Sequence, residues 1–289
     1  MRFRLRSTIY ILCSLILSAS YSSCDLINPE ETIPSFLKID SISLSTNPST
    51  EGNPVQNITD AWVYENEQLV GVYELPAVVP IMKNGDAQIR IRGGIKLNGQ
   101  VGSRVPFLFT NDLVSTIELF PDSQLHLNPT LTFRNDINFP WLEDFDQVGL
   151  SLAKTDFSEA DVIRIEGAEA YDGKSLKMGL TAEQNIFECR TGQSFDLPGG
   201  GTPIFLEFTY RCNNSLVVGL FSRYPSGTFQ IPIIVLNPSE DWNHIYVNLT
   251  DVVSSNATFL DHKPFFGFLR DDDVEGEINV YVDNIRMIY

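Results

Sequence analysis

Short runs of alternating apolar and polar residues constrain the fold of this chain more than any other feature. Examples are FLKIDSISLS, ITDAWVYENEQLVGVYELP and AQIRIRGGIKLNG, and Asn, Gly, Pro and Asp residues separate them. Successive side chains of a strand point to opposite faces, so a period of two is typical of strands buried on one side. No amphipathic helix of ten residues or more is evident. The sequence therefore predicts an all-β protein.

The first β-rich segment, residues 36–135, contains a hairpin. AWVYENEQLVGVYEL reads as two strands that turn at residues 65–67, and KNGDAQIRIRGG restarts the pattern after two prolines. The segment resembles the PEGA or carboxypeptidase-regulatory-like domains, which implies a small β-sandwich that acts as a spacer or docking unit without catalysis. The matching residues are Val63, Tyr64, Asn66, Leu69, Val70, Gly71, Pro80, Gly85, Ile89 and Ile91.

The second β-rich segment, residues 138–289, opens with WLEDFDQVG and closes with INVYVDNIRMIY. The closing VYVDNI and the run DWNHIYVNL resemble parts of carbohydrate-binding modules and galactose-binding-like domains. The resemblance implies a jelly-roll β-sandwich in which the first strand, around EDFD, pairs with the last. A second immunoglobulin-like sandwich is the alternative.

Residues 1–23 predict a lipoprotein signal peptide. An arginine-rich start without acidic residues precedes about 12 mostly apolar residues, fewer than the roughly 20 that span a bilayer. The segment 22–24 resembles a lipobox, in which Cys24 takes the lipid and becomes the first residue of the mature chain. The alternative is ordinary cleavage near Ala19 or Ser20, which leaves Cys24 as a spare thiol.

Residues 24–35 predict an acidic, proline-containing tether. The tether resembles the start of surface-exported lipoproteins of the Bacteroidetes type. That resemblance implies a lipid-anchored protein of the cell envelope, held at the outer membrane and exposed at the cell surface. A plain solvated linker is the alternative.

The charge excludes nucleic acid as a partner. The chain has 37 acidic and 20 basic residues and a net charge of −17, which becomes about −20 once the three signal-peptide arginines are removed. Such a chain repels nucleic acid and anionic lipid surfaces. Attachment to the membrane must therefore come from the lipid anchor.

Cys189 and Cys212 both lie in the second β-rich segment. An oxidising compartment permits a disulfide between them, and both stand at expected strand ends, so a bridge is one prediction. Two buried free thiols are the alternative. Neither cysteine belongs to a CxxC or Cys/His cluster, so a zinc site is not expected.

The sequence contains no catalytic signature. Acidic residues are so numerous that a pair of carboxylates does not by itself indicate a glycosidase. The three histidines are scattered, no Gly-x-Ser-x-Gly turn is present, and the glycine-rich RGGIK and PGGGTP lack the Lys-Ser/Thr of a phosphate loop. We expect a protein that is not an enzyme.

The resemblance to carbohydrate-binding jelly-rolls implies a structural calcium ion that links the first strand to the last. The matching positions are Asp146 in EDFD, Asp283 in YVDN, and the turn at Asp172–Lys174, which supplies main-chain oxygens. Calcium takes six to eight oxygen ligands, so these residue types suit it. Solvated acids are the alternative, and calcium is the one cofactor expected.

Aromatic residues in loops are the candidates for ligand contact, because sugar rings stack on exposed aromatic faces. Tyr224 and Phe229 lie in SRYPSGTFQ with Arg223 beside them, and Trp141 stands at the seam between the segments. Trp242, which starts a strand, is expected to cap the core. We expect a non-catalytic protein with a binding or interaction role, and glycan binding through the jelly-roll is one form that this role can take. The alternative is an accessory or structural lipoprotein that contacts other envelope, secretion or adhesion proteins.

Overall fold

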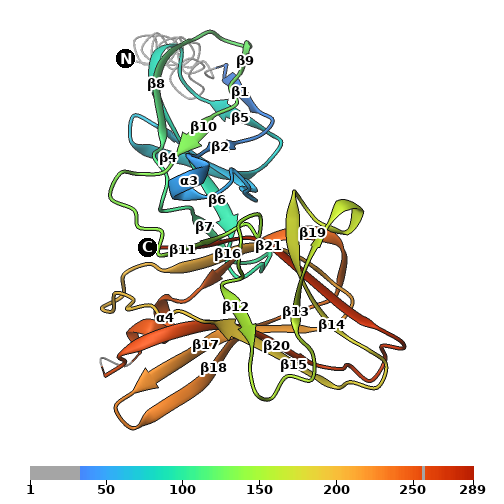
Figure 1. Ribbon diagram of the computed structural model, residues 1–289. Coiled ribbons are helices and arrows are strands. Elements are labelled where there is room, and N and C mark those ends of the chain that lie inside the picture. Colours follow the sequence, from blue (N-terminus) through green and yellow to red (C-terminus); the bar gives the residue numbers. More distant parts are fainter. Residues whose placement is uncertain (1–32, 256–257) are drawn as a thin grey trace, which may run out of the picture.

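The computed structural model describes residues 33–255 and 258–289, and most of its regular structure is β-strand (Figure 1). The predicted lipidation site and most of the tether lie outside these residues. Within the described ranges the helical elements are two short helices and one 3-10 turn, so the all-β prediction is confirmed. They are α3 (Pro48–Glu51), α4 (Thr250–Ser254) and η1 (Gly167–Glu169). None of the described helices has the length and apolar character needed to cross a bilayer.

The N-terminal domain is a small β-sandwich of ten strands in three sheets. The sheet orders are β5-β1-β9, β10-β2 and β4-β3-β6-β7, and β8 also pairs with β6. The strands are β1 (Ser35–Ile39), β2 (Ser43–Ser45), β3 (Asp60–Glu65), β4 (Gln68–Glu74), β5 (Ala77–Ile81), β6 (Gly85–Lys96), β7 (Arg104–Pro106), β8 (Leu113–Leu119), β9 (Gln124–His126) and β10 (Thr130–Thr132). Asn66 and Glu67 join β3 to β4 with positive φ angles of 45° and 66°. Two such residues form the tight turn that matches strand twist, and the predicted hairpin is confirmed.

The C-terminal domain is a jelly-roll of two sheets. The β21 sheet has the order β13-β14-β21-β16-β19, with β11 also paired to β21, and the β20 sheet has the order β12-β15-β20-β17-β18. The strands are β11 (Trp141–Glu143), β12 (Leu152–Lys154), β13 (Val162–Glu166), β14 (Lys174–Leu180), β15 (Ile186–Thr191), β16 (Phe205–Cys212), β17 (Leu216–Tyr224), β18 (Gly227–Leu236), β19 (Ser239–Asn248), β20 (Asp261–Leu269) and β21 (Ile278–Ile288). The first strand pairs with the last, with Trp141 opposite Met287.

The predicted disulfide is wrong. Cys189 lies on β15 in the β20 sheet and Cys212 lies on β16 in the β21 sheet, and both are free and buried. Packed sheets are about 10 Å apart, whereas bridged cysteines have Cα atoms within about 7 Å. The Sγ atom of Cys189 instead contacts Sδ of Met178 at 3.6 Å. Burial raises the pKa of both thiols.

The two domains share an apolar junction. Phe205, Tyr246 and Ile288 belong to strands of the β21 sheet, but they pack in the core of the N-terminal domain. Phe205 meets Phe109 edge-on with 5.2 Å between ring centroids, and Tyr246 lies 5.2 Å from Phe107. The jelly-roll therefore completes the N-terminal core, and this shared packing holds the two domains in one orientation.

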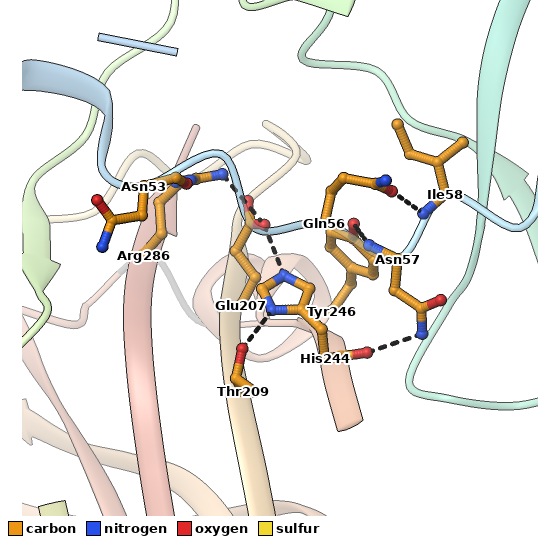
Figure 2. A network of polar contacts seen from close by, with 9 residues as sticks. All are labelled: Asn53, Gln56, Asn57, Ile58, Glu207, Thr209, His244, Tyr246 and Arg286. Carbon is orange, nitrogen blue, oxygen red and sulfur yellow. Dashed lines mark hydrogen bonds and ion pairs between the residues drawn. The ribbon is translucent and has the colours of Figure 1, made fainter. Parts of the chain in front are cut away.

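A buried polar network lies beside this apolar junction (Figure 2). Glu207 is fully buried, and its Oε2 lies 3.2 Å from Nε2 of His244 and 3.4 Å from Nη1 of Arg286. Nδ1 of His244 lies 3.0 Å from the hydroxyl of Thr209. Arg286 also donates to the carbonyl oxygen of Asn53 in the N-terminal domain. Buried polar groups need specific partners, so this network favours a single arrangement of the domains.

Tyr246 connects the apolar and polar parts of the junction. Burial raises the pKa of its hydroxyl, which therefore stays neutral. The hydroxyl oxygen accepts the backbone N–H of Asn57 at 2.7 Å, and the Asn57 side chain donates to the carbonyl of His244 at 3.0 Å (Figure 2). Strand β19 is thus tied to the segment that leads into β3.

Candidate functional site

The outer face of the β20 sheet is the candidate functional site, because the N-terminal domain packs against the other sheet. Gln230, Phe221 and Lys263 stand opposite one another on β18, β17 and β20. Arg190 on β15 stands opposite Phe265 on β20, in the next row of the same face. We call this surface the β20 face; its residues are Glu188, Arg190, Phe221, Gln230 and Lys263.

An aromatic ring with two cations on strands β15 and β20 forms the centre of the β20 face. The half-buried Phe221 ring packs against Phe265 with 5.1 Å between centroids. The guanidinium carbon of Arg190 lies 5.2 Å from the Phe221 centroid. Nζ of Lys263 donates to the carbonyl of Gly192 at 2.7 Å. Apolar ring atoms and positive charge are therefore combined at one place.

Gly219 makes this centre sterically possible. A Cβ atom at this position would lie 2.3 Å from the carbonyl oxygen of Ile231 and 2.6 Å from Cε1 of Phe265. Both distances are shorter than van der Waals contact, so the Phe265 ring fills the space that a side chain would occupy. Phe265 in turn supports the ring of Phe221.

A hollow of about 240 Å³ adjoins the centre. Val217, Gly267 and Leu269 contribute to its apolar part, and Glu188 and Gln230 are among its polar residues. The Glu188 carboxylate accepts the Gln230 amide at 2.5 Å. An apolar concavity with a few placed polar groups is the composition expected of a small-molecule or sugar site.

The three predicted ligand residues lie near the turn of the β17–β18 hairpin, but on both of its faces. Arg223 follows Phe221 by two residues and lies on the β20 face. Phe229 stands opposite Ser222, whose buried hydroxyl contacts His262, so Phe229 and Tyr224 lie on the other face. Tyr224 contacts Phe229 edge-on at 5.1 Å and Phe259 at 4.4 Å between centroids, and Phe229 is 52% exposed. Nε of Arg223 donates to Asp261 at 2.9 Å, and this hydrogen bond lowers the pKa of the Asp261 carboxyl. The aromatic cluster of Tyr224, Phe229 and Phe259 is therefore separate from the ring of Phe221.

The prediction that Trp141 contacts a ligand is wrong. Its side chain is only 5% exposed and belongs to the core of the jelly-roll. The ring stacks on Phe195 with 6.1 Å between centroids, and its N–H donates to the hydroxyl of Ser151 at 3.1 Å. Pairing of β11 with β21 turns the ring into the sandwich.

Trp242 was expected to cap the core, and it lies instead on the outer face of the β21 sheet. It is half-buried between Tyr171 at 5.4 Å and Tyr281 at 6.1 Å, and Arg211 lies 5.1 Å from its ring. The alternation in DWNHIYVN contains the signal for this placement, because Ile245 points into the core and the even-numbered residues therefore point outward.

The residues of the β20 face were not predicted from the sequence. The alternation in IFECRT and LVVGLFSRY does separate their inward residues from their outward ones. It does not show that β15, β17 and β20 are neighbours, and this adjacency is what assembles the face.

The three predicted calcium positions come together beside β21. Asp283 is 1% exposed, and its Oδ2 accepts the Ser175 hydroxyl at 2.6 Å and the Asp172 backbone N–H at 3.4 Å. The main chain at Gly173 lies against Asp146, since a Cβ there would be 2.6 Å from an Asp146 carboxylate oxygen. Burial raises the pKa of Asp283 to about 7, and the charge of Asp146 acts in the same direction.

These residues fit a calcium ion in part. Asp146 and Asp283 are two hard oxygen ligands on adjoining segments, whereas Asp172 turns its backbone N–H toward Asp283. Within the described residues no group of three or more His, Cys, Asp and Glu side chains is arranged to hold a metal. Main-chain carbonyls would therefore have to supply most of the six to eight ligands. The calcium site stays a prediction.

Comparison with known proteins gives similarity only to solved structures. No protein-family model matches the sequence, and no curated protein matches it. A carbohydrate-binding module of the β-sandwich superfamily is 16% identical over 79% of this chain and 84% of its own, with a TM-score of 0.36. The CBM22-2 xylan-binding domain from Paenibacillus barcinonensis is 12% identical over 51% and 97%, with a TM-score of 0.37.

A family 11 carbohydrate-binding module from Clostridium thermocellum, in complex with a mixed-linked tetrasaccharide, is also similar. It is 14% identical over 52% of this chain and 94% of its own, with a TM-score of 0.36.

Proposed function

We propose that this protein is a non-catalytic, glycan-binding lipoprotein and that the β20 face is its binding surface. One observation carries the proposal: the Phe221 ring has the Arg190 guanidinium over it, stands opposite Lys263 in the strand register and lies next to a hollow lined by Glu188 and Gln230. A sugar needs an apolar surface for its C–H groups and polar partners for its hydroxyls, and this face supplies both.

We infer binding without hydrolysis from the state of the nearby carboxylates. Glycosidases use two carboxyl groups on either side of the scissile bond, one of which acts as the acid. Glu188 accepts hydrogen bonds on both oxygens, from Thr155 at 2.7 Å and from Gln230 at 2.5 Å. Asp261 is occupied by Arg223. Both carboxylates are thus already hydrogen-bonded or ion-paired to other side chains of the protein.

Lipid attachment at Cys24 is part of the proposal. A tether of residues 24–35 reaches at most about 40 Å when fully extended, and the N-terminal domain then acts as a spacer between the membrane and the jelly-roll. Metabolic labelling with a fatty-acid probe tests the anchor. The wild-type protein should be labelled and the Cys24→Ala variant should not, and equal labelling of both would exclude this attachment.

A glycan array with residues 25–289 tests the binding function. We expect the wild type to bind one class of polysaccharide and Phe221→Ala to lose most of that binding, because the apolar platform is removed. Phe120→Ala is the control, since Phe120 is 55% exposed in the N-terminal domain. Full binding by a folded Phe221→Ala variant, or no binding of any glycan by the wild type, would contradict the proposal.

A further inference from the structure

We propose that the ligand of the β20 face is an acidic glycan, and that Arg190 and Lys263 bind the carboxylate of one of its uronate residues. This inference rests on the proposed glycan-binding function and specifies the class of glycan.

Arg190 differs from every other arginine that the structure describes. Each of the others has a hydrogen bond or an ion pair from its guanidinium. The Arg190 guanidinium has neither within the described residues, and it lies over the ring of Phe221. A guanidinium carries five N–H donors, so Arg190 keeps its donors available beside an aromatic ring.

The nearest carboxylates on this face are already engaged. Glu188 precedes Arg190 by two residues on the same face of β15, yet it is bound by Thr155 and Gln230. Asp261 precedes Lys263 by two residues on β20 and is paired with Arg223. In a chain with a net charge of −17, most cations have acidic partners close by. The arrangement here leaves two neighbouring cations without an acidic partner.

Lys263 places the second positive charge on the same side of the site. It stands opposite Phe221 in the strand register, and its Nζ reaches the carbonyl of Gly192, two residues beyond Arg190. No acidic side chain lies within ion-pair distance of this Nζ among the described residues. Both cations therefore come from strands on one side of the strand that carries Phe221. A pyranose stacked on Phe221 would direct a ring carboxylate toward them.

The geometry of the donors favours a carboxylate. The planar guanidinium presents parallel N–H groups that match the two oxygens of a carboxylate, and lysine adds a point charge beside it. Phe221 supplies the face on which the sugar ring rests, which a free inorganic anion would not use. An acidic sugar engages all three side chains together, whereas a neutral sugar leaves both cations without a negatively charged partner.

Titration calorimetry with the mature ectodomain tests the inference. The probes are oligosaccharides of galacturonate, of alginate and of glucuronoxylan, each compared with its carboxyl-reduced counterpart, which keeps the chain and loses the charge. We expect at least one acidic probe to bind and its reduced form to bind about tenfold to hundredfold more weakly, the range expected for hydrogen bonds to a charged group. The affinity for the acidic probe should also fall as salt is added.

Two variants assign the effect to residues. Arg190→Gln and Lys263→Gln should weaken binding of the acidic probe and leave the melting temperature unchanged, whereas Arg134→Gln, an exposed arginine of the N-terminal domain, should change neither. Equal binding of acidic and reduced probes, or unchanged affinity in Arg190→Gln, would overturn the inference and leave glycan binding intact. Failure to bind any acidic or neutral glycan would overturn the proposed function and the inference together.

Discussion

Glu207 and Arg286 stand opposite each other on β16 and β21, with Oε2 of the carboxylate 3.4 Å from Nη1 of the guanidinium. Both side chains are closed to solvent. Oε1 of Glu207 and Nε of Arg286 are buried without a hydrogen-bond partner in the described part of the chain. The domain junction thus contains a buried ion pair in which each partner has an atom without a hydrogen bond. Loss of either partner leaves the charge of the other one buried.

We predict that Arg286→Met destabilises the protein by about 3–5 kcal/mol, the cost of breaking a buried pair from one side. The double variant Arg286→Met with Glu207→Gln should regain most of this loss, because no uncompensated charge remains. Urea unfolding followed by fluorescence measures both values. Equal stability of the single and double variants would show that the charge of Glu207 is not the cause.

Gly219→Ala should destabilise the jelly-roll by about 1–3 kcal/mol, as expected for overpacking. The added methyl group meets a carbonyl oxygen and the Phe265 ring at less than 3 Å. Gly199→Ala is the matched control, because nothing lies within 4 Å of a Cβ at that position. Thermal unfolding of the two variants should therefore differ, and identical melting temperatures would contradict the packing described.

We predict that the free energy of unfolding decreases as pH rises, because Asp283 loses its proton. Its pKa is about 7 in the folded chain against an ordinary value of 3.8, so the folded state holds the proton more tightly. The contribution of the protonated Asp283 carboxyl to stability is complete below pH 3.8 and is lost as pH rises to about 7. In EDTA, Asp283→Asn should remove this part of the pH dependence of unfolding. A wild type and variant with the same slope would refute the assignment.

Calcium should reverse that loss if the predicted site exists. At a hundredfold excess over Kd, an ion that binds only the folded state adds about 2.7 kcal/mol, or roughly 5–10 °C in melting temperature for a domain of this size. The measurement compares millimolar calcium with EDTA for the wild type and for Asp283→Ala. An unchanged wild-type melting curve would leave no structural calcium site at Asp146 and Asp283.

Cys189 and Cys212 should be unreactive in the folded protein. Burial raises the pKa of both thiols and removes them from solvent, and the thiolate is the reactive form. Mass spectrometry after alkylation should show no modification of either residue under native conditions and modification of both after unfolding. A reducing agent should leave the melting temperature unchanged, and a marked decrease would indicate a disulfide after all.

The sequence alone determined the features that depend on neighbouring residues. The period of two and the turn residues predicted an all-β chain, and the segment around Asn66 and Glu67 predicted its hairpin, because strand alternation and tight turns are local properties. Resemblance added the pairing of the first jelly-roll strand with the last, which β11 and β21 show.

Only the tertiary structure decided the features that depend on which strands become neighbours. Cys189 and Cys212 proved to lie in opposite sheets, and Trp141 proved to point into the core. Arg190, Phe221 and Lys263 come from three strands that are distant in the sequence and adjacent in the β20 sheet. Alternation tells which side of its own strand a residue occupies. The order and register of the strands, set by packing of the whole core, determine which residues it meets.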